Sequence, residues 1–289
     1  MSTCPPLLVA APPTEAFVGG LFSVARFPDL PPDGNGNRWE CGIEYEAETC
    51  AKLSGWSEVC PPAVPEDKPA TLNFPLVEGK SFTAVLGVTC PLVGYSLDEF
   101  ERRVRNAFRL CEQTTVEEIF WTGSEGNNSL AGTVETPSTC VVPDGATTAA
   151  PLSVVGGVSA IEGFMRQNYC GTPVIHAPAD VAAYAAARQQ VIGTPGRQTT
   201  ALGSRWAFGG GYMVNTGPDG TPAPDGVAWM YATGQVNIWR SDLWINPDDL
   251  RYAFNTRTND VLLYAERKYI VTAEECACIA VPVALSCDC

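Results

Sequence analysis

Residues 96 to 122 read SLDEFERRVRNAFRLCEQTTVEEIFWT, and Gly123 follows them. The stretch is rich in Glu and Arg, although only 17% of the residues of the chain are charged. Ser96 and Glu99 have the spacing of a capping box, in which both side chains satisfy backbone N–H groups that the first helical turn leaves free. Gly123 is a typical helix stop. The pattern therefore predicts one continuous helix over residues 96–122.

Apolar residues recur along this predicted helix at spacings of three and four, which is the pattern of a helix with one buried face. At about 1.5 Å per residue the helix is about 40 Å long, longer than most helices of compact domains. Its opposite face is charged and includes Arg103. Such a helix also fits the core of an ordinary α/β enzyme, so the helix alone does not identify the class of protein. The apolar stripe consists of Leu97, Phe100, Val104, Phe108, Cys111, Val116, Ile119 and Phe120.

The composition predicts a folded, acidic protein. The chain has 289 residues, of which 45% are hydrophobic, enough for a core in one large or two modest domains. Its formal net charge is −14 and it has four lysines, which argues against a dedicated nucleic-acid binder, because such a protein needs clustered Lys and Arg. No apolar run reaches the roughly 18 residues of a membrane-spanning helix. The proline-interrupted N-terminus has no basic region of a signal peptide, so we expect synthesis in a cytoplasm.

Twelve cysteines are spread along the chain, below the density of a disulfide scaffold. Cys90 ends an apolar run and Cys111 lies on the helical stripe, so both are expected in the core. Two C-x-C pairs near the C-terminus suggest metal ligands, but zinc sites usually space their thiols as C-x-x-C. Free thiols, disulfides formed outside the cell and zinc ligation all stay open. The two pairs are Cys276 with Cys278 and Cys287 with Cys289.

The first 81 residues contain little periodic apolar sequence. Residues 1–30 are proline-rich and predict an extended N-terminal arm whose backbone is ordered only by lying on another surface. Residues 31–81 contain two candidate strands among turn residues, which predicts a long projecting hairpin. Its large apolar anchors are Trp39, Tyr45 and Trp56. This segment has too little apolar mass for a core of its own, so it must dock elsewhere.

The remaining sequence alternates strands and helices, which indicates a mixed α/β unit. We expect a strand over 82–90 and, after the long helix, a polar surface connection over 124–150. A helix over 158–168, a buried strand over 172–177 and a helix over 178–192 with Pro178 near its first turn should follow. The last part should form two strands about a turn at Thr233 and Gly234, and two more strands within 259–285.

The chemical inventory is poor for an enzyme. His176, the only histidine, lies in an apolar strand, which favours a packed or interface histidine over a catalytic one. Residues 79–81 read GKS like the end of a phosphate-binding loop, but Phe74 stands where the first glycine should fall. Glu117 and Glu118 diverge by about 100° on a helix, so we expect ion-pair partners and not an acid–base pair. The sequence predicts no catalytic, metal or cofactor-binding site and no cofactor.

The order of these parts resembles the major capsid proteins of tailed bacteriophages, which have the Hong Kong 97-type fold that encapsulin shells share. Residues 96–122 look like the spine helix of the peripheral domain. GTPVIHAPADVAAYAAARQQVIG, residues 171–193, resembles the strand and helix of the axial domain. NDVLLYAERKYIVTAEECACIAVPVAL, residues 259–285, is similar to the closing strands. The resemblance therefore implies an α+β capsid fold.

The resemblance also implies a division of the chain into the parts of such a subunit. These are an N-terminal arm over 1–30, an extended loop over 31–81, a peripheral domain over 82–150 with its spine helix over 96–122, an axial domain over 151–231, and the return strands of both domains over 232–289.

The function that the resemblance implies is structural and not enzymatic. Many copies, arranged as pentamers and hexamers, would tile an icosahedral shell that encloses double-stranded DNA without binding a specific sequence. The implied place is the virion, after assembly in the cytoplasm of a bacterial host, with scaffolding, portal or decoration proteins as partners and no membrane. Two alternatives stay open: an encapsulin-type compartment, and a soluble α/β enzyme with a carboxylate site.

Contacts between subunits are expected at the extended loop and at a charged cluster in the closing strands. These residues are Trp39, Tyr45, Trp56, Glu266, Arg267 and Lys268. In a shell protein any disulfide forms late, between thiols that folding or assembly has brought close. Cys90 and Cys111 are expected to stay reduced in the core. The candidates for bridges, on exposed loops and termini, are Cys4, Cys41, Cys50, Cys60, Cys287 and Cys289.

Overall fold

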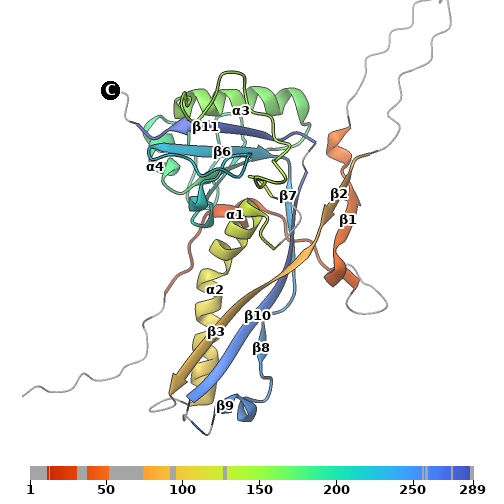
Figure 1. Ribbon diagram of the computed structural model, residues 1–289, viewed down its shortest axis with the longest axis vertical. Helices are drawn as coiled ribbons and strands as arrows, with labels where there is room; N and C mark the ends of the chain where they lie inside the picture. The colour runs from red at the N-terminus through yellow and green to blue at the C-terminus, as the bar shows by residue number, and fades with distance from the viewer. Residues whose placement is uncertain are drawn as a thin grey trace, which may run out of the picture.

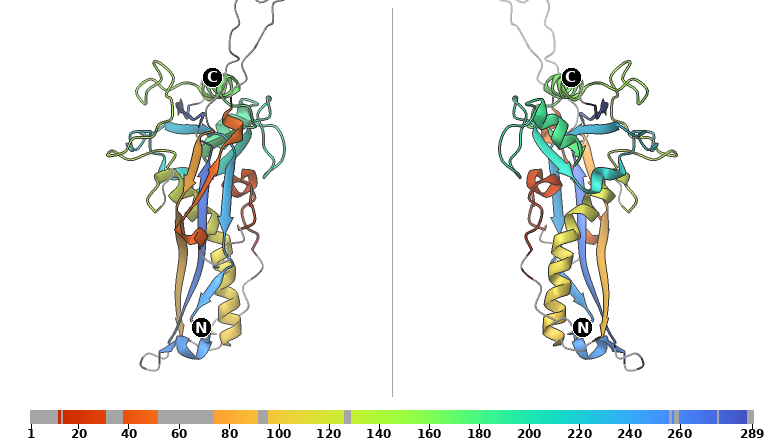
Figure 2. Two further views of the ribbon diagram at one scale, coloured as in Figure 1. Left: turned by 90° about the vertical axis from the view of Figure 1, so that its right-hand side faces the viewer. Right: turned by 90° about the vertical axis from the view of Figure 1, so that its left-hand side faces the viewer.

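The computed structural model describes residues 12, 14–30, 38–51, 74–91, 96–125, 129–255, 257, 260–274 and 276–286. In this part of the chain one long helix, α2 (Leu97–Thr122), runs beside two long strands, β3 (Ser81–Pro91) and β10 (Asp260–Ala273), as Figure 1 shows. A second group of helices and strands lies at one end of this rod. The molecule is therefore elongated, and the side views of Figure 2 agree.

Helix α2 begins and ends where the sequence predicts. The Ser96 hydroxyl accepts a hydrogen bond from the Glu99 N–H at 3.2 Å. At the other end the Gly123 N–H donates to the Ile119 carbonyl at 2.7 Å. Gly123 has a φ of 67°, in the left-handed region that favours glycine after a helix. Local capping therefore sets both ends of the helix.

The buried face of α2 departs from the predicted stripe at one position. The face follows steps of four and passes through Glu112, whose side chain is 9% exposed and meets Arg267 of β10. Cys111, one position away, is an exposed thiol. The structure thus corrects the expectation that Cys111 lies in the core. The side chains on the observed path are Phe100, Val104, Phe108, Glu112, Val116 and Phe120.

Helix α2 covers one face of an antiparallel sheet in which β10 pairs with every other strand. Strand residues alternate between faces, so Val261, Leu263 and Ala265 are buried in the core with α2, whereas Leu262 and Tyr264 are exposed on the other side. Among the described residues this other face of the sheet is therefore open at Leu262 and Tyr264. The remaining strands are β7 (Val236–Arg240), β8 (Trp244–Asn246) and β9 (Phe254–Asn255), which follows η4 (Leu250–Ala253).

The second sheet is buried on both faces. Its order is β11-β6-β4-β5, and β4 and β5 are parallel, joined through α4. Ile175 packs with α3 and α4 on one face, whereas Tyr231 meets Trp121 of α2 on the other, at 4.9 Å between ring centroids. The end of α2 therefore joins the two sheets in one molecule. The elements are α3 (Val154–Asn168), β4 (Val174–Pro178), α4 (Val181–Ala187), β5 (Arg205–Gly209), η3 (Gly211–Val214), β6 (Val227–Thr233) and β11 (Ile279–Ala284).

The strands on either side of Thr233 and Gly234 do not pair with each other. Strand β6 belongs to the second sheet and β7 to the first, so the chain crosses between sheets at this point. It crosses back between β10 and β11. The two crossovers are joined, because the Gly234 N–H donates to the Glu274 carbonyl at 3.0 Å and the Glu274 N–H to the Gln235 carbonyl at 3.1 Å.

The N-terminal region is more closely tied to its own chain than the sequence suggests. Helix α1 (Gly20–Val24) buries Leu21 in the core that α2 and the first sheet share, so the predicted arm does not extend to residue 30. The predicted hairpin has a base of β1 (Ile43–Glu46) paired with β2 (Leu76–Gly79). The short helices η1 (Arg38–Cys41) and η2 (Glu48–Cys50) flank β1.

Two helix predictions need correction. Helix α3 starts four residues before the predicted 158, because Ser153 caps it by accepting from the Gly156 N–H at 3.1 Å. Helix α4 is much shorter than 178–192: Pro178 ends β4, and Gln189 has a φ of 58°, which no helix continues through. No helix among the described residues is long and apolar enough to cross a membrane.

We predict that Phe108→Ala lowers the free energy of unfolding of the unassembled chain by about 3 to 5 kcal/mol, because it leaves a cavity beside a ring that is 3% exposed. The matched control is Arg102→Ala on the same helix, whose side chain is 67% exposed and lies 3.8 Å from Glu99. It should cost less than about 1 kcal/mol. Urea unfolding measures both, and equal losses would contradict the orientation of α2.

Candidate functional site

Trp39 and Tyr45, two of the residues expected at subunit contacts, anchor the base of the hairpin to their own chain. Trp39 is 7% exposed and packs against Trp239 of β7. The Tyr45 ring lies 6.0 Å from that of Trp239, and its hydroxyl lies 3.2 Å from Thr272 Oγ1. Both side chains pack on their own subunit, and their contact with a neighbouring subunit stays a prediction. Trp56 lies outside the described residues.

The charged cluster of β10 is divided between the two faces of the strand. Arg267 points to α2 and pairs with Glu112 at 2.7 Å, with 12% and 9% of the two side chains exposed. Lys268 points to the other face and pairs with Glu40 of η1 at 2.5 Å. Both residues thus have ion-pair partners within the chain, and their contacts with a neighbouring subunit stay a prediction. The role of Glu266, on the same face as Lys268, stays a prediction.

We call the surface of β3, β10 and β8 that points away from α2 the outer face. In the sheet Glu266 lies between Val85 and Trp244, and Tyr264 lies beside Gly87. Large apolar side chains that gather on an exposed surface mark a contact surface for another molecule. The apolar side chains of the outer face are Val85 at 59% exposure, Trp244 at 47%, Tyr264 at 39% and Leu262 at 37%.

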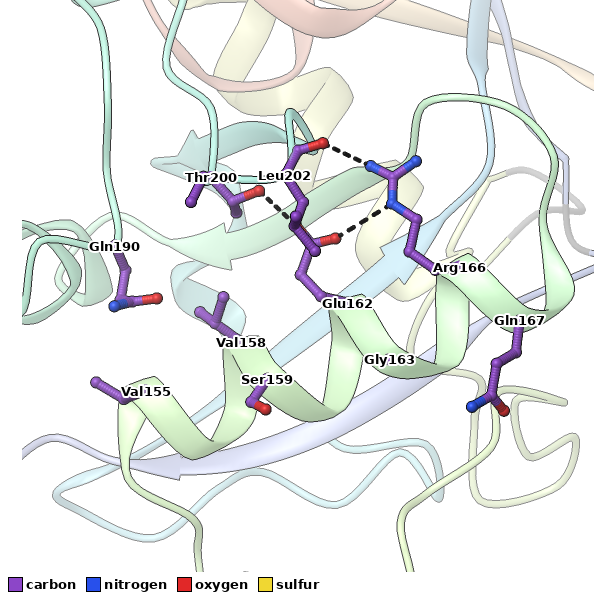
Figure 3. Close-up of a pocket in the computed structure, with 11 residues that line it drawn as sticks. Val155, Val158, Ser159, Glu162, Gly163, Arg166, Gln167, Gln190, Thr200 and Leu202 are labelled. Atoms are coloured by element: carbon purple, nitrogen blue, oxygen red, sulfur yellow. Dashed lines mark hydrogen bonds and ion pairs between the residues drawn. The ribbon is translucent and has the colours of Figure 1, made fainter.

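A groove of about 590 Å³ lies between α3 and the loop before β5 (Figure 3). Glu162 of α3 projects into it with its side chain 8% exposed, accepts a hydrogen bond from the Thr200 hydroxyl and lies 3.6 Å from Arg166 Nε. Arg166 also donates to the Leu202 carbonyl at 2.8 Å. The lining includes no histidine or cysteine, so the groove holds no Ser–His or Cys–His pair. It offers a surface for contact and not a nucleophile with its base.

His176 is a packing residue, as the sequence predicts. It is fully buried, with Nδ1 3.0 Å from the Tyr212 hydroxyl and Nε2 3.0 Å from Thr233 Oγ1. Burial lowers the pKa of His176 to about 3, because the charged imidazolium would lose its hydration. A neutral imidazole with both nitrogens engaged in the core cannot reach a substrate.

Glu117 is the polar residue whose role the sequence did not predict. It is fully buried, and its carboxylate accepts from the Leu21 N–H at 2.9 Å, the Gly211 N–H at 3.1 Å and the Gln113 amide at 3.0 Å. Burial raises its pKa, although these donors lower it in part. The expected role of Glu117 as an ion-pair partner is wrong, since its carboxylate binds N–H donors that join α1 and η3 to α2. The run Gly209–Gly211 is the signal that a backbone approaches closely here.

Among the described residues the chain forms two disulfides, Cys50–Cys276 and Cys140–Cys278, with Cα–Cα distances of 5.6 Å and 4.6 Å. The first ties the base of the hairpin to the crossover between β10 and β11. Cys50 was expected among the bridging cysteines, and its partner lies within the same subunit. The C-x-C pair also takes two different partners and does not act as one unit.

The other cysteine predictions divide into two groups. Cys41 is an exposed, free thiol, and its bridge stays a prediction. The other candidates lie outside the described residues: Cys4, Cys60, Cys287 and Cys289.

We predict that His176 makes the protein less stable in acid. Its folded pKa of about 3 lies below the ordinary 6.5, so below pH 6.5 the unfolded chain binds a proton that the folded chain does not. The free energy of unfolding should then fall by about 1.4 kcal/mol per pH unit between these values. Urea unfolding from pH 7 to pH 4 should show a shallower slope for His176→Gln. Equal slopes would contradict the buried, neutral state.

Comparisons with protein-family models and with curated proteins find no match to this chain. Solved structures match over nearly the whole length at low identity. The capsid of an empty GTA particle has 12% identity and a TM-score of 0.55, over 95% of this chain and 100% of that chain. A chain of Mycobacterium phage Bobi has 12% identity and a TM-score of 0.55, over 98% and 96%. The capsid of Myoviridae phage XM1 has 13% identity and a TM-score of 0.50, over 96% of both.

At such identities the likeness concerns the fold. It includes nearly all of both chains, so it rests on the whole arrangement of long helix, long strand pair and second sheet and not on one shared motif. This chain has the α+β fold of tailed-phage capsid proteins, the Hong Kong 97-type fold that its sequence resembles.

Proposed function

We propose that this chain is the major capsid protein of a tailed bacteriophage, many copies of which assemble into an icosahedral shell around double-stranded DNA. The observation that carries the proposal is the whole-length likeness to the capsid of an empty GTA particle and to the capsid of Myoviridae phage XM1. A structural role also agrees with the burial of His176 and with the absence of a nucleophile–base pair in the groove beside α3.

The outer face suits contact with a neighbouring copy. Obligate subunit interfaces have an apolar centre and commonly exceed about 2,000 Å². The outer face supplies such a centre, because Val85, Trp244 and Tyr264 are exposed on adjacent strands and Glu266 lies among them. The groove beside Glu162 would supply a second contact, in which a neighbour's side chain meets Val155, Leu202 and the Glu162 carboxylate.

The proposed parts of the subunit follow the order of the sequence, with one change. The N-terminal arm comprises the residues before α1, since Leu21 belongs to the core. The hairpin base β1–β2 begins and ends the extended loop. The first sheet with α2 is the peripheral domain, and the second sheet with α3 and α4 is the axial domain, around which pentamers and hexamers would form.

The proposed setting follows from the same role. Assembly would take place in the cytoplasm of the bacterial host, with scaffolding, portal or decoration proteins as partners, and the mature protein would be in the virion. The net charge of −14 agrees with a shell that encloses DNA without binding it, because the negative charges of protein and DNA repel each other. No enzymatic activity, cofactor or membrane contact is part of this proposal.

Electron microscopy of the purified protein tests the proposal directly. Closed particles that contain nuclease-protected DNA, after expression with the other genes of the phage, would support a phage head. Particles that contain a cargo protein in place of DNA would indicate an encapsulin-type compartment. A compact monomer under all assembly conditions would favour a soluble enzyme and contradict the proposal.

We predict that Val85→Lys reduces the yield of particles at least tenfold and leaves the folded subunit intact. The new lysine would face Glu266 across the strands, so the free chain gains an ion pair, whereas an interface would have to bury a charge. The control is Val134→Lys, the same change at a valine that is 79% exposed in a loop. Sedimentation measures the yield. Normal assembly of Val85→Lys would show that the outer face is not a subunit contact.

A further inference from the structure

Three cysteines from distant parts of the chain lie near the place where the hairpin base joins the crossover between the two sheets. Cys50 and Cys276 form a disulfide and are separated by 226 positions. The third, Cys170, follows α3 and is an exposed, free thiol. Its sulfur donates to the carbonyl of Ala51, the residue next to Cys50, at 3.6 Å. The free thiol therefore contacts the backbone of the residue that follows one end of this disulfide.

A buried hydrogen-bond network holds the three segments in place. The Tyr169 hydroxyl donates to the Glu274 carboxylate at 2.6 Å and accepts from the Gln235 N–H at 2.9 Å. The Thr49 hydroxyl donates to the same carboxylate. Tyr169 and Glu274 are 4% and 8% exposed. Each of the three cysteines is one or two residues from a member of this network, so their backbones cannot drift apart while the network is intact.

The disulfides Cys50–Cys276 and Cys140–Cys278 differ in access to solvent. Cys276 is exposed, whereas Cys278, in the disulfide with Cys140, is 6% exposed. Exchange of a disulfide requires that a thiolate can approach one of its sulfurs. The Cys50–Cys276 bond meets this condition, and Cys140–Cys278 fixes the crossover independently of it.

We propose that Cys50, Cys170 and Cys276 form a thiol–disulfide exchange site. The Cys170 thiol loses its proton, and its sulfur attacks the sulfur of Cys50. The Cys50–Cys170 bond forms as the Cys50–Cys276 bond breaks, and Cys276 leaves as a thiolate that takes up a proton. One disulfide and one thiol are present before and after the step, so it needs no oxidant or reductant.

The exchange transfers the covalent anchor of the hairpin base. In one state the base is tied to the crossover through Cys276, and in the other to the residue after α3 through Cys170. The chain thus has two covalently distinct states of one fold, and both keep Cys140–Cys278. This inference concerns the chain itself and is independent of its proposed assembly into a shell.

The test traps the free thiol of each state. Native protein without reductant is treated with iodoacetamide, digested at acidic pH to stop exchange, and mapped by mass spectrometry without reduction. We expect alkylated Cys170 together with Cys50–Cys276, and alkylated Cys276 together with Cys50–Cys170. Cys170→Ser should abolish alkylation of Cys276. The matched control Cys41→Ser removes another exposed thiol and should leave the pattern unchanged.

Alkylation at Cys170 with none at Cys276 would overturn the proposal, and so would alkylation of Cys276 that persists in Cys170→Ser. A second variant, Cys276→Ser, tests the same geometry from the other side. With oxidised glutathione as the oxidant, its Cys50 should pair with Cys170. Cys50 that stays free, or that pairs with any other cysteine, would show that Cys170 does not reach it.

Discussion

The carboxylate of Glu117 is the polar contact on which the arrangement of the chain around α2 depends. It lies fully buried, and a buried charge is tolerated only where hydrogen-bond donors replace its water. Two of those donors are the backbone N–H groups of Leu21 and Gly211. They belong to α1, which precedes α2 in the sequence, and to η3, which follows it. The carboxylate therefore fixes α1 and η3 to α2 near the C-terminal end of the helix, where α2 packs against the second sheet. The close approach also explains two glycines, since a Cβ at Gly20 or Gly211 would meet Glu117 atoms at 2.1 Å or 2.6 Å.

The shared core around this contact makes the two sheets one structural body. Alternate residues of the second sheet face different neighbours: Ile175 packs with α3 and α4, and His176 lies 5.5 Å from the Phe120 ring of α2. The chain also crosses between the sheets twice, and the crossovers bond to each other through Gly234 and Glu274. A boundary between the sheets therefore passes through this hydrogen-bonded junction. The resemblance to capsid proteins implied a boundary between residues 231 and 232, which lie close to it.

Local signals in the sequence predicted the parts of the fold that local contacts determine. The ends of α2 follow from Ser96, Glu99 and Gly123, and the packing of His176 follows from its apolar strand. The strands around Gly234 could not be assigned to two sheets, because a turn that joins a hairpin and a turn that leaves a sheet use the same residue types. Cys111 lies three residues after Phe108 and Glu112 lies four after it, and both spacings fit a helical stripe. Only Arg267, far away in the sequence, decides between them.

The candidate site was the least predictable part, because the sequence does not show which surface an aromatic side chain packs against. Trp39 and Tyr45 appeared free in a segment with no core, but they cover the outer face of β10 at Ile270 and Thr272. Where that cover ends, the same face continues with Tyr264 and Leu262 exposed. One strand face thus packs against its own hairpin base along part of its length and remains open along the rest. Contact of the open part with a different surface of the next copy would be heterologous, and heterologous contacts generate rings when their rotation closes.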